Sequence, residues 1–486
     1  MSTYDTIIIG AGMSGLAAGI RLAYYDRRVC ILERHTTIGG LNSFYRLGGR
    51  NFDVGLHAVT NFTPKGTRKG PLARLLRQLR FNWDDFSLAP QIGSTIAFPG
   101  VSLGFTNQFD FLRSEVERNF PDEKDNFQKL SEAVTEYDDL NEQSGNCSAR
   151  SIVSQFIKDP LLVDMLFCPL MFYGSAREHD MDFGQFSVMF RSIFMEGFAR
   201  PWAGVRVILK KLVQKFKALG GELRLRAGVE RIEVDGPRVS GVVLKDGTQL
   251  AAERVLSSAG WCETMRLCDQ PQPVEPPQPG QLSFVESVSV LNAQPRELGC
   301  DRTIVFFNDG AKFDWRKPNQ LVDVRSGVIC CPNNFDYTQP LDDGMVRVTA
   351  LANYDLWKTQ SPADYEAAKR DAYARMTASA VRFVGDFRPH VVATDTFTPL
   401  TIKRFTGHEN GAVYGTPQKR FSGTTHLKNL FICGTDQGFV GIIGAMFSGI
   451  AMVNRHILSG GRELLPSPLV GEGGERSKPG EGATLP

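Results

Sequence analysis

Residues 4–35, "YDTIIIGAGMSGLAAGIRLAYYDRRVCILERH", decide the fold of this chain. The three consecutive isoleucines are β-branched and predict a buried strand, and Gly10, Gly12 and Gly15 follow with GxGxxG spacing. A helix comes next, and residues 29–32 predict a second strand. Strand, helix and strand in this order predict an α/β fold with a parallel sheet.

Each glycine of this loop has a separate mechanical role. Gly10 turns the chain tightly, Gly12 lets the backbone approach a pyrophosphate, and Gly15 lets the helix pack closely on the strand. The helix then presents unpaired N–H groups to the phosphates. Glu33 follows the second strand and is placed to accept hydrogen bonds from a ribose hydroxyl. The stretch therefore predicts a dinucleotide cofactor.

The residues after Glu33 favour FAD over NAD as that cofactor. In "RHTTIGGLN", Gly39 and Gly40 bring a second piece of backbone against the same pyrophosphate. No other strand–GxGxxG–helix pattern occurs downstream, which argues against a second nucleotide domain. Direct visits by a nicotinamide cofactor stay open.

A second glycine-rich loop lies near the other end of the chain. Residues 430–449, "LFICGTDQGFVGIIGAMFSG", predict a short strand, a glycine turn and an apolar helix. A turn shaped to contact a ligand and a turn before a core helix are both compatible with this pattern.

Composition limits the classes of partner. The 486 residues are enough for two domains and a large buried cofactor. With 55 basic and 53 acidic residues, the charge gives no reason to expect nucleic acid. The nine scattered cysteines contain no CxxC pair and indicate reduced thiols in the cytoplasm, and the seven histidines form no HExxH, so no metal site is expected.

Strand-like residues begin at Thr6, which leaves no room for a cleaved leader, and no run approaches the roughly 20 apolar residues of a spanning helix. We expect a cytoplasmic protein that is soluble or peripheral on the inner face of a membrane. Nothing in the sequence predicts its oligomeric state.

The chain changes character between the two loops. From about residue 50 to 202 the spacing of apolar residues is mostly helical, and strand patterns return from residue 222. We therefore expect a discontinuous cofactor domain from residues 1–60, 205–270 and 425–460, and a substrate domain from residues 61–204 and 271–424. Residues 461–486 are rich in Gly, Pro and Ser and predict a disordered tail.

The segment "FSVMFRSIFMEGFARPW", residues 186–202, combines aromatic residues with Arg191 and Arg200. Such a segment can dip into a bilayer interface and admit a lipid-soluble substrate. Burial in the core of the insert explains the same pattern. Both interpretations are open at this stage.

Four blocks of sequence resemble the FAD-dependent phytoene desaturase, carotenoid isomerase and retinol saturase family, within the amine-oxidase-like flavoproteins. They are "IIIGAGMSGLAAG", "ERHTTIGG" with "FDVGLH", "RAGVERI" and "LFICGTDQGFVGIIGAMFSGIA", and they cover about residues 4–60, 205–260 and 428–456. The resemblance implies an α/β fold with a discontinuous, Rossmann-like FAD-binding domain and an inserted α+β substrate domain. It also implies an oxidoreductase of carotenoid biosynthesis, with a hydrophobic isoprenoid substrate and peripheral membrane association.

The resemblance further implies that both glycine loops serve one FAD. Asp436 would lie near the ribityl chain and the pyrophosphate, Gly441 and Ile442 near the pyrimidine edge of the flavin, and the backbone of Val229 near adenine. The full expected set of cofactor-binding residues is Gly10, Gly12, Gly15, Glu33, Arg34, Gly39, Gly40, Leu41, Val229, Gly434, Asp436, Gly441 and Ile442.

One departure from the family pattern bears on substrate. Many amine oxidases and desaturases carry an arginine after the glycine pair, where this chain has Leu41. The leucine makes the match closer to the isomerase and saturase branches. His57 is the candidate catalytic residue, because histidine exchanges protons near neutral pH, and a structural histidine is the alternative.

Three functions remain. The first is desaturation, isomerisation or saturation of a carotenoid-type polyene. The second is flavin amine oxidase chemistry on a small polar substrate. The third is a flavin-binding protein without catalysis.

Overall fold

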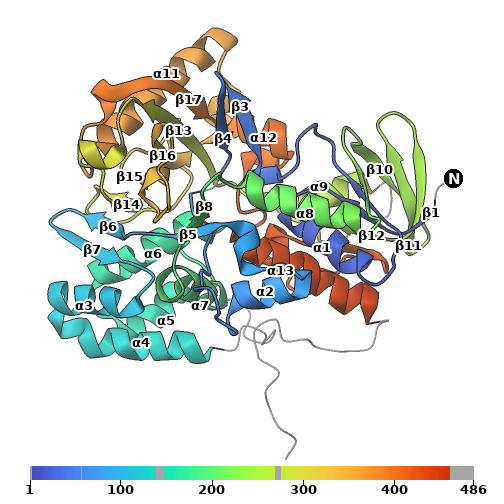
Figure 1. Ribbon diagram of the computed structural model, residues 1–486, viewed down its shortest axis with the longest axis horizontal. Coiled ribbons are helices and arrows are strands. Elements are labelled where there is room, and N and C mark those ends of the chain that lie inside the picture. Colours follow the sequence, from blue (N-terminus) through green and yellow to red (C-terminus); the bar gives the residue numbers. More distant parts are fainter. Residues whose placement is uncertain (1–2, 56, 138–146, 269–274, 460–486) are drawn as a thin grey trace, which may run out of the picture.

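Two large β-sheets organise the molecule. The computed structural model describes residues 3–55, 57–137, 147–268 and 275–459, and the expected tail at 461–486 lies outside them. In Figure 1 one sheet lies at the right, the second at the upper left, and a group of helices at the lower left. The α/β class with an inserted α+β part, expected from the sequence, is confirmed.

The first sheet has seven strands and a parallel centre. Its path is β10-β11-β12-β1-β2-β9, and β18 pairs with the last residues of β12. The pairs β1–β12, β1–β2, β2–β9 and β12–β18 are all parallel, so these strands run in the same direction. The strands are β1 (Thr3–Ile9), β2 (Val29–Leu32), β9 (Glu222–Arg224), β10 (Val229–Asp235), β11 (Arg238–Leu244), β12 (Gln249–Ser257) and β18 (Leu430–Ile432).

The register of this sheet brings distant segments to one edge. Ile9 is level with Leu32 on one side and with Ser257 on the other, and Ser257 is level with Ile432. Four parallel strands therefore end in one row. In parallel sheets, ligands bind outside this carboxyl edge.

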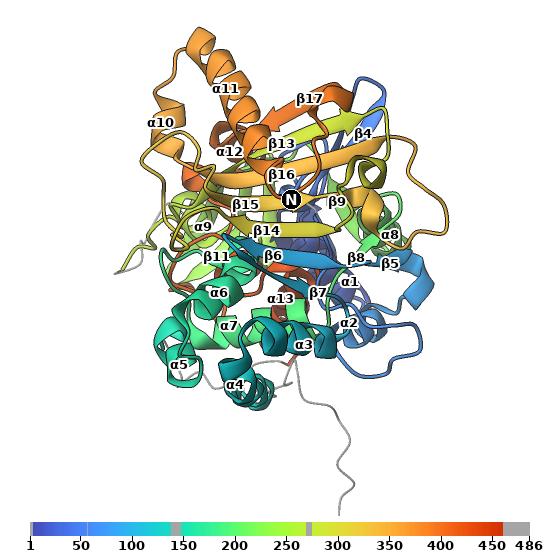
Figure 2. The ribbon, with the colours of Figure 1, turned by 90° about the vertical axis from the view of Figure 1, so that its left-hand side faces the viewer.

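The second sheet also has seven strands, in the order β17-β13-β16-β15-β14-β6-β7, and only the β14–β6 pair is parallel. Figure 2 shows its strands one below another from β17 to β7, with α11 above the sheet and the helices α3 to α7 below it. The strands are β6 (Ser94–Phe98), β7 (Val101–Phe105), β13 (Ser283–Leu291), β14 (Ile304–Asn308), β15 (Ser326–Cys330), β16 (Gly344–Ala352) and β17 (Val391–Phe397).

Two short antiparallel pairs complete the strands: β3 (Phe44–Leu47) with β4 (Arg50–Asp53), and β5 (Leu88–Pro90) with β8 (Ala199–Pro201). The helices are α1 (Met13–Ala23), α2 (Pro71–Leu79), α3 (Phe109–Asn119), α4 (Lys124–Glu136), α5 (Ala149–Phe156), α6 (Pro160–Gly174), α7 (Phe183–Phe190), α8 (Arg206–Ala218), α9 (Trp261–Leu267), α10 (Tyr354–Lys358), α11 (Pro362–Ala380), α12 (Pro399–Thr406) and α13 (Gly441–Val453).

The phenylalanines of the aromatic segment 186–202 lie in the core, and Trp202 at its end is exposed. Phe186, Phe190, Phe194 and Phe198 are each fully buried, and the ring of Phe190 contacts those of Phe186 and Phe194. Burial of one such side chain stabilises a fold by about 1.5–3 kcal/mol. These four rings are therefore not a surface that dips into a bilayer. A membrane-facing role for other parts of the insert stays a prediction, as do the exact domain bounds.

Within the described residues, one helical stretch, Gly441–Leu458, is long and apolar enough to cross a membrane, and 56% of it is buried. It consists of α13 and the π-helical turn that follows, and α13 packs on α1. Core helices have the same length and composition, so the stretch alone does not indicate a membrane span.

Candidate functional site

The loop between β1 and α1 uses its three glycines differently. Gly10 has φ +98°, in the left-handed region that favours glycine. A Cβ on Gly15 would lie 2.2 Å from the carbonyl oxygen of Gly10, so only glycine allows the helix to pack this closely on the strand. A Cβ on Gly12 would have no neighbour within 4 Å. Gly12 therefore faces open space at the carboxyl edge of the sheet.

Glu33, directly after β2, is held against this loop. Its Oε2 accepts a hydrogen bond from the N–H of Ala11 at 2.9 Å, and its Oε1 accepts one from the N–H of His35 at 2.9 Å. A carboxylate has about four acceptor positions, so acceptor positions remain for hydroxyl groups of a ligand. The side chain is buried and fixed.

The start of β10 lies beside Glu33. The N–H of Ala227 donates to the carbonyl of Glu33 at 2.8 Å, and a Cβ on Gly228 would lie 3.3 Å from the Cβ of Arg34. Val229 begins the strand at this point. The guanidinium of Arg34 turns away and donates to the carbonyl of Arg404 at 3.0 Å. Glu33, Arg34 and Val229 are thus close together.

The second glycine pair lies against the first loop. Gly39 donates its N–H to the carbonyl of Ala11 at 3.0 Å, and a Cβ on Gly40 would lie 3.9 Å from the Cα of Gly12. Both residues have positive φ, which favours glycine. Leu41 follows. A Cβ on Gly55 would lie 2.5 Å from the carbonyl oxygen of Leu41, so the backbone of Gly55 lies against Leu41.

The loop after β18 closes on the same place from the other side. A Cβ on Gly434 would lie 3.2 Å from the Oγ of Ser14, in the first turn of α1. Further along α13, a Cβ on Gly449 would lie 2.0 Å from the carbonyl of Ser14. Figure 1 shows α1 and α13 side by side at the edge of the first sheet. The two glycine loops, 420 residues apart in sequence, are therefore neighbours.

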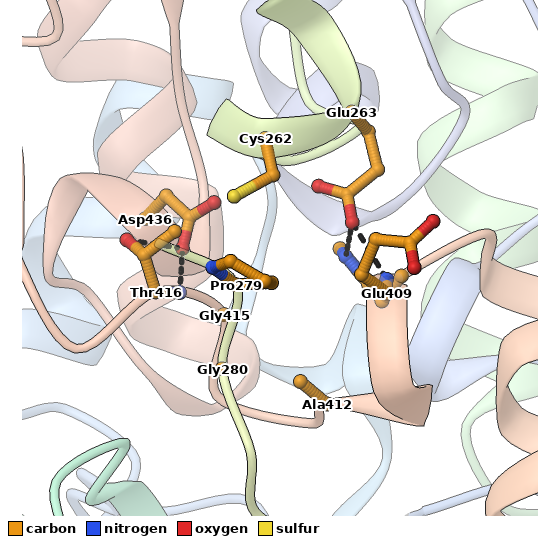
Figure 3. A pocket seen from close by; sticks show the side chains of 10 residues that line it. Cys262, Glu263, Pro279, Gly280, Glu409, Ala412, Gly415, Thr416 and Asp436 are labelled. Carbon is orange, nitrogen blue, oxygen red and sulfur yellow. Dashed lines mark hydrogen bonds and ion pairs between the residues drawn. The ribbon is translucent and has the colours of Figure 1, made fainter. Parts of the chain in front are cut away.

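Asp436 connects three segments of chain with a buried carboxylate. Its Oδ2 accepts from the N–H of Trp261 at 2.5 Å, and its Oδ1 accepts from the N–H of Thr416 at 2.6 Å and from the Thr416 hydroxyl at 3.2 Å. Figure 3 shows the Asp436–Thr416 contacts beside Gly415. The carboxylate thus positions protein segments, and its predicted contact with a ribityl chain stays a prediction.

The first turn of α13 is open to a ligand. Val440, the residue before the helix, makes no side-chain cap, and Gly441 has φ +72°. Uncapped N–H groups at a helix start favour negative charge. A Cβ on Gly441 would lie 3.3 Å from the Oγ1 of Thr60, so Thr60 lies beside this helix start. Ile442 points into the core.

His57 faces the second sheet. Its Nε2 lies 3.1 Å from the hydroxyl of Thr349 and 3.8 Å from Oε2 of Glu286, and its Nδ1 is buried with no hydrogen-bond partner among the described residues. Burial, together with the positive charges of Arg347 and Arg200, lowers the pKa of His57 well below its usual range. The imidazole is therefore neutral at neutral pH.

Two charged pairs near His57 were missed by reasoning from the sequence. Arg347 is 1% exposed and its Nε donates to Oε1 of Glu286 at 2.6 Å. Arg200 donates to Oδ2 of Asp53 at 2.5 Å. The partners lie 61 and 147 residues apart, and all four residues lie within strands. The only signal is an arginine or a glutamate at a position where strand alternation expects an apolar residue.

A family model described as flavin containing amine oxidoreductase matches residues 13–455. The chain is 24% identical to prolycopene isomerase of Arabidopsis thaliana, over 93% of this chain and 82% of that protein. It is 22% identical to all-trans-retinol 13,14-reductase of Danio rerio, over 93% of this chain and 86% of that protein. The solved structure of an oxidoreductase from Methanosarcina mazei has a TM-score of 0.65 at 14% identity, covering 92% of this chain and 99% of that one.

Proposed function

The chain belongs to the flavin-containing amine oxidoreductase family, and on that premise we propose that it is an FAD-dependent oxidoreductase acting on a hydrophobic isoprenoid of the carotenoid type. Membership confirms the family resemblance carried by the glycine-rich loops, and it makes the chain a flavin enzyme. The identity of the flavin, the substrate class and the site residues belong to the proposal.

The single observation that carries the proposal is the meeting of three chain segments at one sheet edge. Gly12 faces open space there, Gly40 lies against it, and Gly434 lies beside the first turn of α1. Open space over glycine backbone at two helix starts suits a long, anionic ligand. One elongated dinucleotide suits this arrangement better than two small ligands.

FAD rather than FMN is proposed because the edge has a place for an adenosine. Glu33 is fixed with spare acceptor positions, and Val229 and the backbone of residues 226–228 lie beside it. FMN has no adenosine and would leave these residues without a ligand.

Replacing Glu33 by Gln should therefore weaken FAD binding and leave FMN binding unchanged, as measured by fluorescence titration.

A bound flavin supplies the capacity to take up or release two electrons. The residues of the chain then orient it and control charge and water. The uncapped N–H groups at the start of α13 stabilise negative charge at the edge that they face. His57 stays neutral, and its buried Nδ1 can accept or donate one hydrogen bond depending on the tautomer. Val440, directly before α13, packs against the aromatic core of the insert, and this core excludes water from that side of the helix start.

An isoprenoid substrate is proposed from the relatives and from Leu41. The relatives described above are a prolycopene isomerase and an all-trans-retinol 13,14-reductase, and both align over most of their length. Leu41 stands where many amine oxidases and desaturases carry an arginine, and the isomerase-like and saturase-like branches lack that arginine. Desaturation, isomerisation and saturation all fit these observations.

We also propose that the protein is cytoplasmic and associates peripherally with a membrane, where such substrates dissolve. Ile92, Phe111 and Trp202 are large apolar side chains of the insert that are 44%, 41% and 37% exposed. Exposed apolar side chains favour an interfacial contact. Cosedimentation with liposomes tests this, and protein that stays in the supernatant contradicts it.

The function is tested with purified, FAD-loaded protein and substrates in liposomes. Prolycopene, phytoene and retinol are incubated separately under oxidising and reducing conditions, and the polyene absorbance is followed. We expect one of the three spectra to shift. No shift in any condition contradicts the proposal, and peroxide release with amines would instead identify an amine oxidase.

A further inference from the structure

A cavity of about 490 Å³ lies outside the proposed flavin site. It is formed where β5, the end of β7, the segment after Asn61 and the π-helical turn Arg191–Met195 meet. Its volume is in the range of small-molecule sites. Its lining includes Phe62, Pro64, Pro90, Gln108, Met195 and Glu196.

One carboxyl group dominates the polar part of this cavity. Glu196 follows the π-helical turn, a distortion that is frequent at functional sites. One of its oxygens accepts a hydrogen bond from the amide of Asn61 at 2.7 Å. Burial raises the pKa of Glu196 to about 7, although the Asn61 hydrogen bond and the charge of Arg191 oppose the shift. The guanidinium of Arg191 donates to the carbonyls of Val134 and Tyr137.

The lining determines the charge of a ligand. Among its residues there is no lysine or arginine, and Glu196 is the one acid. A phosphate or carboxylate would contact no cation in this lining and would be repelled by an ionised Glu196. Phe62, Pro64, Pro90 and Met195 supply apolar surface on which a hydrocarbon can pack. An uncharged molecule with one polar end fits both parts.

The cavity and the proposed flavin site share a wall. The hydroxyl of Thr60 donates to Oδ1 of Asn61 at 3.0 Å, and Asn61 in turn holds Glu196. Thr60 also lies against Gly441, at the start of α13. Backbone hydrogen bonds from Asn61 to Ser192 and from Phe62 to Gly197 fix this wall. A ligand in the cavity is thus separated from the helix start by Thr60 and Asn61.

We propose that this cavity is a binding site for the polar end of an uncharged isoprenoid that carries one hydroxyl or carbonyl group, with Glu196 as its hydrogen-bonding partner. The inference rests on the proposed function, because the isoprenoid class is taken from it. Gln108 and Pro64 are exposed and form the rim through which the ligand enters.

The test compares two probes that share a hydrocarbon body. Full-length, FAD-loaded protein is dialysed to equilibrium against all-trans-retinol or retinoic acid, at pH 8.5 and pH 6.0. At pH 8.5 retinol should bind at least about tenfold more tightly than retinoic acid, because the carboxylate of the probe meets the ionised Glu196. At pH 6.0 the carboxyl of Glu196 is mostly protonated, and the difference should narrow.

Two variants and a control locate the effect. Glu196→Gln keeps an acceptor for Asn61 and should remove the difference between the probes at pH 8.5. Glu132→Gln is the same change on the exposed face of α4 and should leave the difference as in the wild type. Gln108→Trp, at the exposed rim, should block entry and lower the affinity for retinol by about tenfold or more.

The inference is overturned if Glu196→Gln keeps the wild-type difference or if Gln108→Trp binds retinol normally. The proposed function survives that result when a polyene spectrum still shifts with the FAD-loaded protein. If the protein binds no retinol and converts no polyene, the pocket and the proposed function both fail.

Discussion

Gly12 and Gly15 stand three residues apart in one loop but have different surroundings. A Cβ on Gly12 would enter open space, and a Cβ on Gly15 would collide with the carbonyl of Gly10 at 2.2 Å. The first glycine is therefore free for a ligand, and the second is required by the fold. The sequence motif predicts both roles, because they follow from the GxGxxG spacing alone.

This difference gives a matched pair of variants. Without flavin, Gly12→Ala should have the same free energy of unfolding as the wild type, because φ at Gly12 is −75° and the added methyl group meets no protein atom. It should lower FAD affinity by about tenfold or more, because the methyl group occupies the ligand's space. Gly15→Ala should lower the free energy of unfolding by about 1–3 kcal/mol, because it overpacks the helix against the strand. Urea denaturation and FAD titration distinguish the two, and equal FAD affinity in Gly12→Ala and wild type would sink the assignment of Gly12.

His57 predicts a dependence of stability on pH. Its pKa is lowered in the folded protein, so the unfolded chain binds the proton first as the pH falls below about 6.5. Folding stability should then fall with decreasing pH, by at most about 1.4 kcal/mol per pH unit for this one group. Glu196, with its raised pKa, acts in the opposite direction over the same range.

The contribution of His57 is therefore isolated by comparison with His57→Asn. Urea denaturation at pH 7.0 and pH 5.5 should show a smaller loss on acidification for His57→Asn than for the wild type. Equal losses would mean that the wild-type imidazole is not held neutral.

Partners of individual side chains were beyond sequence-based prediction. Nothing near His57 in the chain indicates Thr349, which lies 292 residues away. The carboxylate of Asp436 was expected beside a ribityl chain, and the structure adds donors from Trp261 and Thr416 that only the tertiary fold brings together. Spacing predicts local geometry, and long-range hydrogen bonds depend on packing.

At the scale of elements, the contact between α1 and α13 positions the two glycine loops. Gly449 and Gly444 both lie within α13. A Cβ on Gly449 would lie 2.0 Å from the carbonyl of Ser14, but a Cβ on Gly444 would have its nearest neighbour at 3.6 Å. One glycine is thus needed for close helix packing and the other is not.

Gly449→Ala should separate the two helices, lower the free energy of unfolding by about 1–3 kcal/mol and weaken FAD binding. Gly444→Ala should leave both unchanged or slightly increase stability, because alanine favours a helix by about 1 kcal/mol over glycine. Thermal unfolding and FAD titration of both variants check this. Similar behaviour of the two variants would contradict the packing explanation.

Elements with a clear period were predicted well, and elements whose surroundings decide their role were not. The strands Thr3–Ile9 and Val29–Leu32 and the helix Met13–Ala23 agree with the patterns in the sequence. The aromatic segment 186–202 left core and membrane interface equally open, because both environments favour the same side chains. The π-helical turn Arg191–Met195 has no sequence signature.

At the scale of the molecule, a buried ion pair joins the β3–β4 pair to the insert. Arg200 on β8 is 5% exposed, and Asp53 on β4 is 7% exposed and also accepts from the N–H of Val205. Arg200→Met would leave a buried carboxylate without its cation and should cost about 3–5 kcal/mol of folding stability.

The double variant Asp53→Asn with Arg200→Met removes the uncompensated charge and keeps an acceptor for Val205. It should be more stable than Arg200→Met alone in urea denaturation. If the double variant loses as much stability as Arg200→Met and Asp53→Asn lose together as single variants, the ion pair does not join the β3–β4 pair to the insert in the way described.

The arrangement of the cofactor domain could be predicted from the sequence, because the blocks of this fold occur in a fixed order. The alignment of Ile9, Leu32, Ser257 and Ile432 in one row follows from parallel pairing of the strands that carry these blocks. The second sheet was foreseen only as a set of strands. Its order, with β6 and β7 added from residues 94–105, depends on long-range pairing that no local pattern encodes.

The central claim is that two glycine loops at opposite ends of the chain hold one FAD. An experimental structure of the FAD-loaded protein tests it most directly. We expect a single FAD per chain, with its pyrophosphate over Gly12 and its flavin ring at the start of α13 beside Gly441. FAD that contacts only one of these loops, or two ligands in separate cavities, would contradict the claim.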